Sequence, residues 1–149
     1  DPENALFYFV MGNIYDNMAN PKDKNTGKEL AKPQEFDDYF KNAEANYLKA
    51  IELNPANQEY LYNSLYNLGA MYNNYGGFIA GAEAKNTKHQ KEIDANAQEF
   101  YKKAIPYLER ALALRSGDKS TMLALRKLYL LTKDTQKAKE MSERLKAVE

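Results

Sequence analysis

Large residues recur around a single glycine in the middle of the chain, and this pattern constrains the fold most. Leu65, Leu68 and Tyr72 are spaced by three and four residues, as on one stripe of an amphipathic helix, and Gly69 lies among them. A glycine inside a helix costs about 1 kcal/mol relative to alanine. Gly69 therefore predicts that another helix passes so close that a Cβ would clash.

The same spacing occurs three times, and each occurrence begins 57 residues after the one before. The matching sets are Tyr8, Met11, Gly12 and Tyr15, then Leu65, Leu68, Gly69 and Tyr72, then Met122, Leu125, Arg126 and Tyr129. A second apolar stripe follows each set, formed by Ala43, Tyr47 and Ala50, by Ala104, Leu108 and Ala111, and by Ala138, Ser142 and Leu145. This periodicity predicts three pairs of helices.

The boundaries of these helices follow from the periodicity and from capping residues. Asp118 and Asp134 each precede an apolar stripe and are predicted N-caps, while Asn86 or Thr87 is expected to cap the long fourth helix. The expected helices are Glu3–Met18, Phe36–Leu53, Gln58–Asn74, Thr87–Leu114, Asp118–Leu131 and Thr135–Ala147.

Residues 42–55, NAEANYLKAIELNP, lie between the segments YFVMGNIY and YNLGAMY, and together these resemble the tetratricopeptide repeat (TPR), whose period is about 34 residues. The resemblance covers three units, about 5–57, 62–118 and 119–149. It implies one all-α domain over residues 1–149, a superhelical solenoid of three antiparallel helix pairs. Ser116 and Arg126 depart from the residues usual in the family, which makes the third unit the weakest match.

Two insertions lengthen the first two units, at about 19–35 and 76–88. The first is rich in Asn, Pro, Gly and Lys and is expected to be a surface loop. The second opens with the glycine-rich run 76–81 and is also expected to be an interhelical loop. It carries Phe78 and Ile79, which either fold back on the domain or make accessory contacts with a partner.

The first four residues, Asp1-Pro2-Glu3-Asn4, resemble the link Asn54-Pro55-Ala56-Asn57 between the first two units. This similarity leads us to expect at least one further helix pair upstream, in a longer protein of which this chain is a fragment. The N-terminal face of the chain would then be an exposed junction between repeats.

The residues offer no pattern that would support catalysis, a metal or a cofactor. The chain has no cysteine, so disulfides and thiolate ligands are excluded and the redox compartment stays undetermined. The single histidine, His89, has only Glu92 one turn away, which is too few ligands for a metal site. We expect a protein that is not an enzyme and that needs no cofactor.

Composition and charge limit the classes of partner that we expect, but they do not identify a partner. No apolar run approaches the ~18 residues of a membrane span, so we expect a soluble chain, cytoplasmic or, if a leader was removed, periplasmic or otherwise exported. Residues 101–149 carry a net charge of +6 against −6 for residues 1–100, which indicates either an acidic partner at the C-terminal end or ordinary solvated faces. The sequence has no stripe of alternating basic and aromatic residues, so we do not expect it to bind nucleic acid.

In the TPR family, one face of each unit's first helix lines a concave groove that binds a peptide. The residues on that face here are Phe9, Asn13, Asn17, Asn63, Tyr66, Asn67, Ala70 and Asn74, and Lys127 is a further candidate contact. Asparagine offers a donor pair and an acceptor for a peptide backbone, and the aromatic rings offer stiff apolar area. The alternative is that these asparagines only face solvent and the rings only fill the stack.

Some TPR domains clamp an acidic C-terminal peptide with asparagines and cations on this face. Asn13 and Asn67 match the two asparagines, but Phe9, Ser120 and Ala124 stand where the cations should be. We therefore expect a peptide held by backbone hydrogen bonds and apolar contacts. The function expected is a scaffold module for a protein or peptide partner, and the alternative is a structural spacer or a self-associating array.

Overall fold

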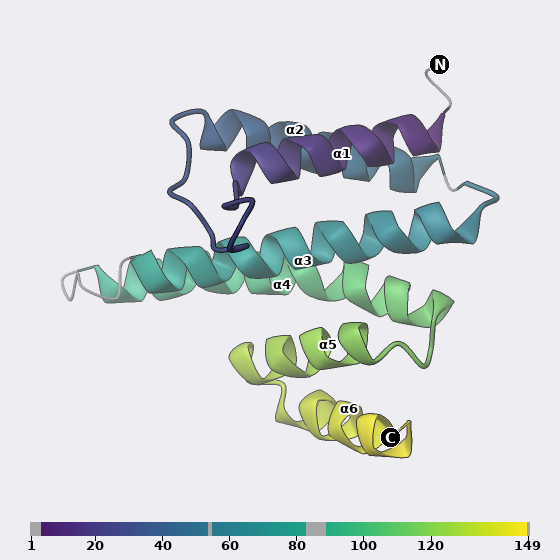
Figure 1. Cartoon of the computed structure of the whole chain (residues 1–149). Coiled ribbons are helices and arrows are strands. Elements are labelled where there is room, and N and C mark those ends of the chain that lie inside the picture. Colours follow the sequence, from purple (N-terminus) through teal and green to yellow (C-terminus); the bar gives the residue numbers. More distant parts are fainter. Residues whose placement is uncertain (1–3, 54, 83–88, 149) are drawn as a thin grey trace. The chain divides into compact units, whose positions relative to one another are not determined.

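A computed structural model of the chain describes residues 4–53, 55–82 and 89–148, and within them six α-helices follow one another (Figure 1). The helices are α1 (Ala5–Ala19), α2 (Phe36–Glu52), α3 (Gln58–Ala82), α4 (Gln90–Leu114), α5 (Lys119–Leu131) and α6 (Thr135–Ala147). Among the described residues the one strand-like feature is a single antiparallel bridge between Lys22 and Glu29. The prediction of an all-α fold is confirmed.

The chain divides into two compact units, residues 1–67 and 68–149. The boundary falls inside α3, so the first ten residues of that helix, Gln58–Asn67, belong to the first unit and the remainder to the second. Each unit has its own core, and the two are described separately below.

In the first unit, α1 and α2 form an antiparallel pair around a close contact at Gly12. A Cβ on Gly12 would lie 2.6 Å from Cδ1 of Tyr47, whose ring is fully buried. Three residues further along α1, the ring of Tyr15 meets that of Tyr39, with centroids 6.5 Å apart. As the residue number increases along α1, the residue number of its contact on α2 decreases, so the two helices are antiparallel.

In the second unit, α3 and α4 form a second antiparallel pair, and the contact predicted at Gly69 is confirmed. A Cβ on Gly69 would lie 2.6 Å from Cγ of Leu108 and 3.3 Å from the carbonyl oxygen of Ala104. The backbone of α4 therefore passes where the sequence predicted a neighbouring helix. Leu68, Ala104 and Leu108 are fully buried at this crossing.

The prediction of a loop over residues 76–88 is wrong as far as Ala82, because α3 continues as a helix to that residue, and residues 83–88 lie outside the described part of the chain. Gly76 lies two turns after Gly69 on the same face, and a Cβ there would lie 2.7 Å from the Tyr101 ring and 3.2 Å from the Ala97 carbonyl oxygen. Gly76 is therefore a packing glycine rather than a turn residue. The extra turns of α3 are held against α4 by an edge-to-face contact of Tyr75 with the Phe100 ring, whose centroids are 4.6 Å apart.

The remaining boundaries agree with the sequence to within a few residues wherever the structure describes them. Asp118 accepts a hydrogen bond from the Thr121 backbone N–H at the start of α5, and Asp134 accepts one from Lys137 at the start of α6. Both predicted N-caps are confirmed. The predicted caps at Asn86 and Thr87 lie outside the described residues.

The first insertion lies outside the helices, as predicted, and most of its residues are exposed. Its tip is a tight turn in which the Asp23 carboxylate accepts hydrogen bonds from the backbone of Asn25 and from both the backbone and hydroxyl of Thr26. Gly27 follows with a φ of 67°, a conformation that glycine adopts at little cost. The turn brings Lys22 and Glu29 together in the β-bridge.

Two glycines on α3 allow a matched test of the helix crossing. Gly69→Leu should overpack the contact with Leu108 and the α4 backbone and lower the free energy of unfolding by at least ~1–3 kcal/mol. Gly77→Leu is the control, because a Cβ there meets nothing within 4 Å and leucine is the better helix former by up to about 1 kcal/mol. Urea unfolding followed by circular dichroism measures both. Equal effects of the two substitutions would contradict the packing role of Gly69.

Candidate functional site

Two asparagines from the predicted groove face meet in the first unit. Asn67 on α3 donates a hydrogen bond from Nδ2 to Oδ1 of Asn13 on α1 over 2.8 Å. The same Oδ1 accepts a second hydrogen bond, also of 2.8 Å, from the hydroxyl of Tyr47 on α2. Three helices thus contribute one side chain each to a fixed polar cluster, and both asparagines are half-buried.

The glycine before Asn13 makes this cluster possible. Because Gly12 has no side chain, the Tyr47 ring lies directly against α1 and its hydroxyl reaches the next residue, Asn13. Burial, reinforced by the nearby Asp16 carboxylate, raises the pKa of Tyr47 well above its usual value. The hydroxyl therefore stays protonated and acts as a donor, which fixes the orientation of the Asn13 amide.

A second polar cluster lies one turn further along α1. The Asp16 carboxylate accepts a hydrogen bond of 2.7 Å from the Asn20 amide, and Asn20 in turn accepts one from the Lys32 ammonium of the first insertion. Burial raises the pKa of Asp16, against the opposing effects of the Asn20 hydrogen bond and the charges of Lys32 and Lys22. Burial also lowers the pKa of Lys32, which lies 4.9 Å from the centroid of the Phe36 ring.

The two aromatic residues predicted for the groove are half-buried and stacked on neighbours. The Phe9 ring of α1 stacks on Tyr60 of α3 at a centroid distance of 6.4 Å, and Tyr66 stacks on Tyr62 at 6.0 Å. Phe9 pairs with Tyr60, and Asn13 pairs with Asn67, one turn later on α1 and two turns later on α3. The α1 and α3 segments of this unit therefore run in the same direction, with an aromatic contact beside the amide pair.

The other predicted residues are less closely grouped. Asn17 is exposed one turn after Asn13, and Asn63 is half-buried one turn before Asn67. In the second unit, Ala70 is half-buried and Asn74 is exposed, both on α3. The accessory candidates Phe78 and Lys127 are exposed and Ile79 is half-buried, but Phe78 and Ile79 lie on α3 rather than on a loop.

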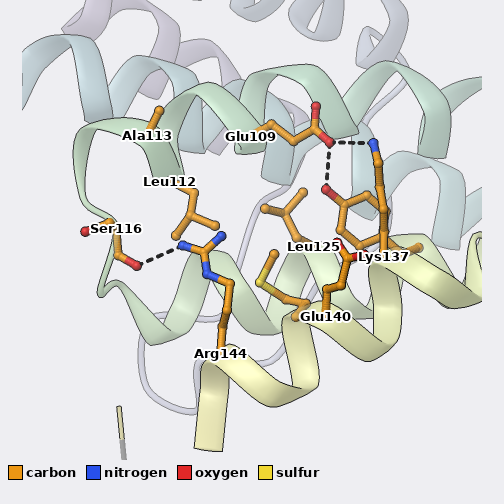
Figure 2. A pocket seen from close by; sticks show the side chains of 10 residues that line it. Glu109, Leu112, Ala113, Ser116, Leu125, Lys137, Glu140 and Arg144 are labelled. Carbon is orange, nitrogen blue, oxygen red and sulfur yellow. Dashed lines mark hydrogen bonds and ion pairs between the residues drawn. The ribbon is translucent and has the colours of Figure 1, made fainter. Parts of the chain in front are cut away.

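A pocket that the sequence did not predict lies in the second unit, between α4, α5 and α6 (Figure 2). It has a volume of about 340 Å³, with apolar side chains of Leu112, Leu125 and Met141 among those that line it. At one end the Glu109 carboxylate accepts hydrogen bonds from the Tyr129 hydroxyl (2.7 Å) and from the Lys137 ammonium (3.1 Å).

Arg144 also lines this pocket, and its guanidinium donates a hydrogen bond of 3.2 Å to the Ser116 carbonyl oxygen (Figure 2). The rim carries two cations, Lys137 and Arg144, and two carboxylates, Glu109 and Glu140. It therefore favours neither an anionic nor a cationic ligand. This pocket can accommodate an apolar side chain. Within the described residues no group of three His, Cys, Asp or Glu side chains could hold a metal ion.

Sequence reasoning identified Asn13 and Asn67 but missed what holds them. Tyr47 was assigned to the core by its apolar spacing, and nothing in the sequence signals that its hydroxyl reaches Asn13. Lys32, 12 residues from Asn20 in an irregular segment, also could not be assigned a partner. The glycine at position 12 is the one local signal, because it implies that a bulky group approaches α1 next to Asn13.

Removal of the Tyr47 hydroxyl tests the polar cluster. Tyr47→Phe should keep the ring packed on Gly12 and cost about 1 kcal/mol of unfolding free energy, the worth of one buried hydrogen bond. Tyr107→Phe is the control, since the described residues show no hydrogen bond to its hydroxyl while its ring still packs on Tyr72. If chemical denaturation gives the two variants the same stability, the cluster does not hold Asn13.

The raised pKa of Asp16 predicts a dependence of stability on pH. A carboxyl whose pKa is raised on folding stabilises the fold below its unfolded pKa, 3.8, and loses that contribution as the pH rises through its folded pKa. Asp16→Asn should therefore be more stable than the wild type near pH 7, and this advantage should vanish near about pH 3.5. Glu99→Gln, at an exposed position on α4, is the control. Lower stability of Asp16→Asn at pH 7 would mean that the Asn20 and Lys32 interactions outweigh burial.

Comparison with known proteins adds no family to this description. The chain matches no family model, no curated protein and no solved structure. None of the helices in the described ranges is long and apolar enough to cross a membrane. The contacts within each unit are therefore the grounds on which a function can be proposed.

Proposed function

We propose that this chain is a TPR-like module that binds an extended segment of a partner protein along α1 and the first part of α3. The observation that carries the proposal is the contact of Asn13 with Asn67, two polar side chains 54 residues apart that meet at a half-buried position. Aromatic rings of Phe9 and Tyr66 lie on the same two helices.

The chemistry of the amide pair suits a peptide backbone. The Oδ1 atom of Asn13 already accepts two hydrogen bonds, so the group left to bind a ligand is its Nδ2 donor. Asn67 uses a donor toward Asn13 and keeps its carbonyl oxygen as an acceptor. A donor and an acceptor side by side match the alternating carbonyl and N–H groups of an extended chain, and Tyr47 holds them in place before the ligand arrives.

The same residues argue against a ligand bound by its carboxylate. The cation that takes part in the hydrogen-bond networks of α1 described above is Lys32, which donates to Asn20 and interacts with Asp16. Phe9 and Tyr60 instead provide a stacked apolar surface. A neutral backbone with apolar side chains is therefore the ligand that this surface fits best.

The repeat architecture is part of the same proposal. Gly12 against Tyr47 and Gly69 against Leu108 are equivalent contacts, 57 residues apart on the first helices of two antiparallel pairs. In the third pair Arg126 replaces the glycine, and α5 and α6 are shorter than α3 and α4. This recurrence supports a TPR-like array whose first two pairs are the most regular.

A defined peptide pool tests the function without a known partner. The purified chain is used to select binders from a random peptide display library, and the Kd of an enriched peptide is measured by fluorescence anisotropy. Asn17→Ala combined with Asn63→Ala removes amides one turn from the central pair without breaking the Tyr47 hydrogen bond. This double variant should weaken binding by about tenfold, or 1.4 kcal/mol.

The matched control is Asn42→Ala combined with Asn46→Ala on α2. Each of these amides donates a hydrogen bond to the carbonyl oxygen four residues earlier in its own helix. The control should bind the selected peptide as the wild type does. If no peptide is enriched, or if both double variants lose binding equally, the groove does not carry the function and the structural-spacer alternative is favoured.

A further inference from the structure

One face of α1 is apolar and exposed, in contrast to the groove face beside it. Between 39% and 51% of each large side chain on this face is accessible to solvent. Its members are Leu6, Phe7, Val10, Ile14 and Met18, and we call them the outer face of α1. At 100° per residue they span an arc of about 120° and form a stripe along the helix that Asn17 alone interrupts.

The other sides of α1 are less exposed or are polar. Ala5, Gly12 and Ala19 lie on the opposite side and are buried. The one charged residue of α1, Asp16, lies away from the outer face and is engaged by Asn20. The outer face therefore carries no charge that would repel an identical copy.

The internal repeat shows that this side of a first helix is usually covered. The residues 57 and 114 positions after Phe7 are Ser64 and Thr121, and both are fully buried. Those equivalent to Ile14 are Met71 and Leu128, which are also buried. Phe7 is larger and more apolar than the Ser and Thr that face the chain's own helices at this position, which indicates a surface adapted to a different occupant.

The size of the outer face is consistent with a dimer interface. Phe7, an aromatic side chain of ~150–250 Å², exposes about 100 Å², and with the four aliphatic members the outer face presents on the order of 400 Å² of apolar area. That is within the range of the largest patches on monomeric proteins, which are often functional. Two copies would bury about 800 Å², and since homodimer interfaces are about 65% apolar this corresponds to about 1,200 Å² in total, the lower limit of a specific interface.

We propose that a second copy of this chain covers the outer face, with α1 packed against α1 of the partner about a twofold axis. A twofold contact places the same patch on both sides, which an uncharged apolar stripe satisfies without further adaptation. An interface at this lower size limit is typical of weak, transient complexes, so we expect a Kd in the micromolar range. Of the groove residues on α1, Phe9 and Asn13 lie outside the outer face, whereas Asn17 lies within its arc, so the two surfaces meet at Asn17.

Sedimentation equilibrium of the purified chain, from about 1 to about 200 μM, tests the proposal. The wild type should rise from its monomer mass of 17.1 kDa toward twice that value. Val10→Glu combined with Ile14→Glu should weaken dimerisation at least tenfold, because two charges would be buried in each copy. Leu123→Glu combined with Leu130→Glu is the control, since these leucines on α5 are at least as exposed as Val10 and Ile14 and the substitutions should leave dimerisation unchanged.

The absence of cysteine allows a second, independent measurement. Val10→Cys places one thiol per chain near the middle of the outer face, and a short bis-maleimide should crosslink two copies efficiently. Leu123→Cys should crosslink no better than random collision allows. A wild type that stays monomeric throughout the concentration range, or equal crosslinking at both positions, would overturn the proposal and leave another repeat or another protein as the occupant.

Discussion

The contact of a glycine with a large side chain across each of the first two helix pairs is the constraint on which the other features depend. Gly12 accommodates Tyr47, and Gly69 and Gly76 accommodate Leu108 and Tyr101. Each glycine costs about 1 kcal/mol of helix propensity, which close packing must offset. In the first pair the same contact also delivers the Tyr47 hydroxyl to Asn13, so the geometry of the candidate site follows from the packing of the pair.

The same glycines show how far the sequence could predict the fold. Apolar spacing identified the six helices, and aspartates marked the starts of α5 and α6, because these signals act within one or two turns. The segment 76–81 was misassigned because glycine is both a helix breaker and a packing residue. The position of Tyr101 on α4 decides between these roles, and that position depends on tertiary packing.

In the candidate site, too, the features that depend on nearby residues could be predicted, whereas those that depend on distant residues could not. Asn13 could be placed on a helix face from its spacing, and so could Asn67, but their mutual hydrogen bond depends on how α1 and α3 pack. Lys32 is more difficult still, since its approach to Asn20 depends on the course of an irregular segment. Side-chain periodicity therefore predicts which face of the helix carries the asparagines, whereas the partners that orient their amides are set by tertiary packing.

The two proposals share one helix, and this has a thermodynamic consequence. Asn17 lies between Leu6 and Val10 around the helix, about 20° from each, so the polar face and the outer face of α1 overlap at this residue. A dimer would carry two peptide sites and would gain avidity for a partner with two copies of the segment. Any peptide that binds the dimer more tightly than the monomer must strengthen dimerisation by the same factor, because coupling between binding equilibria is reciprocal.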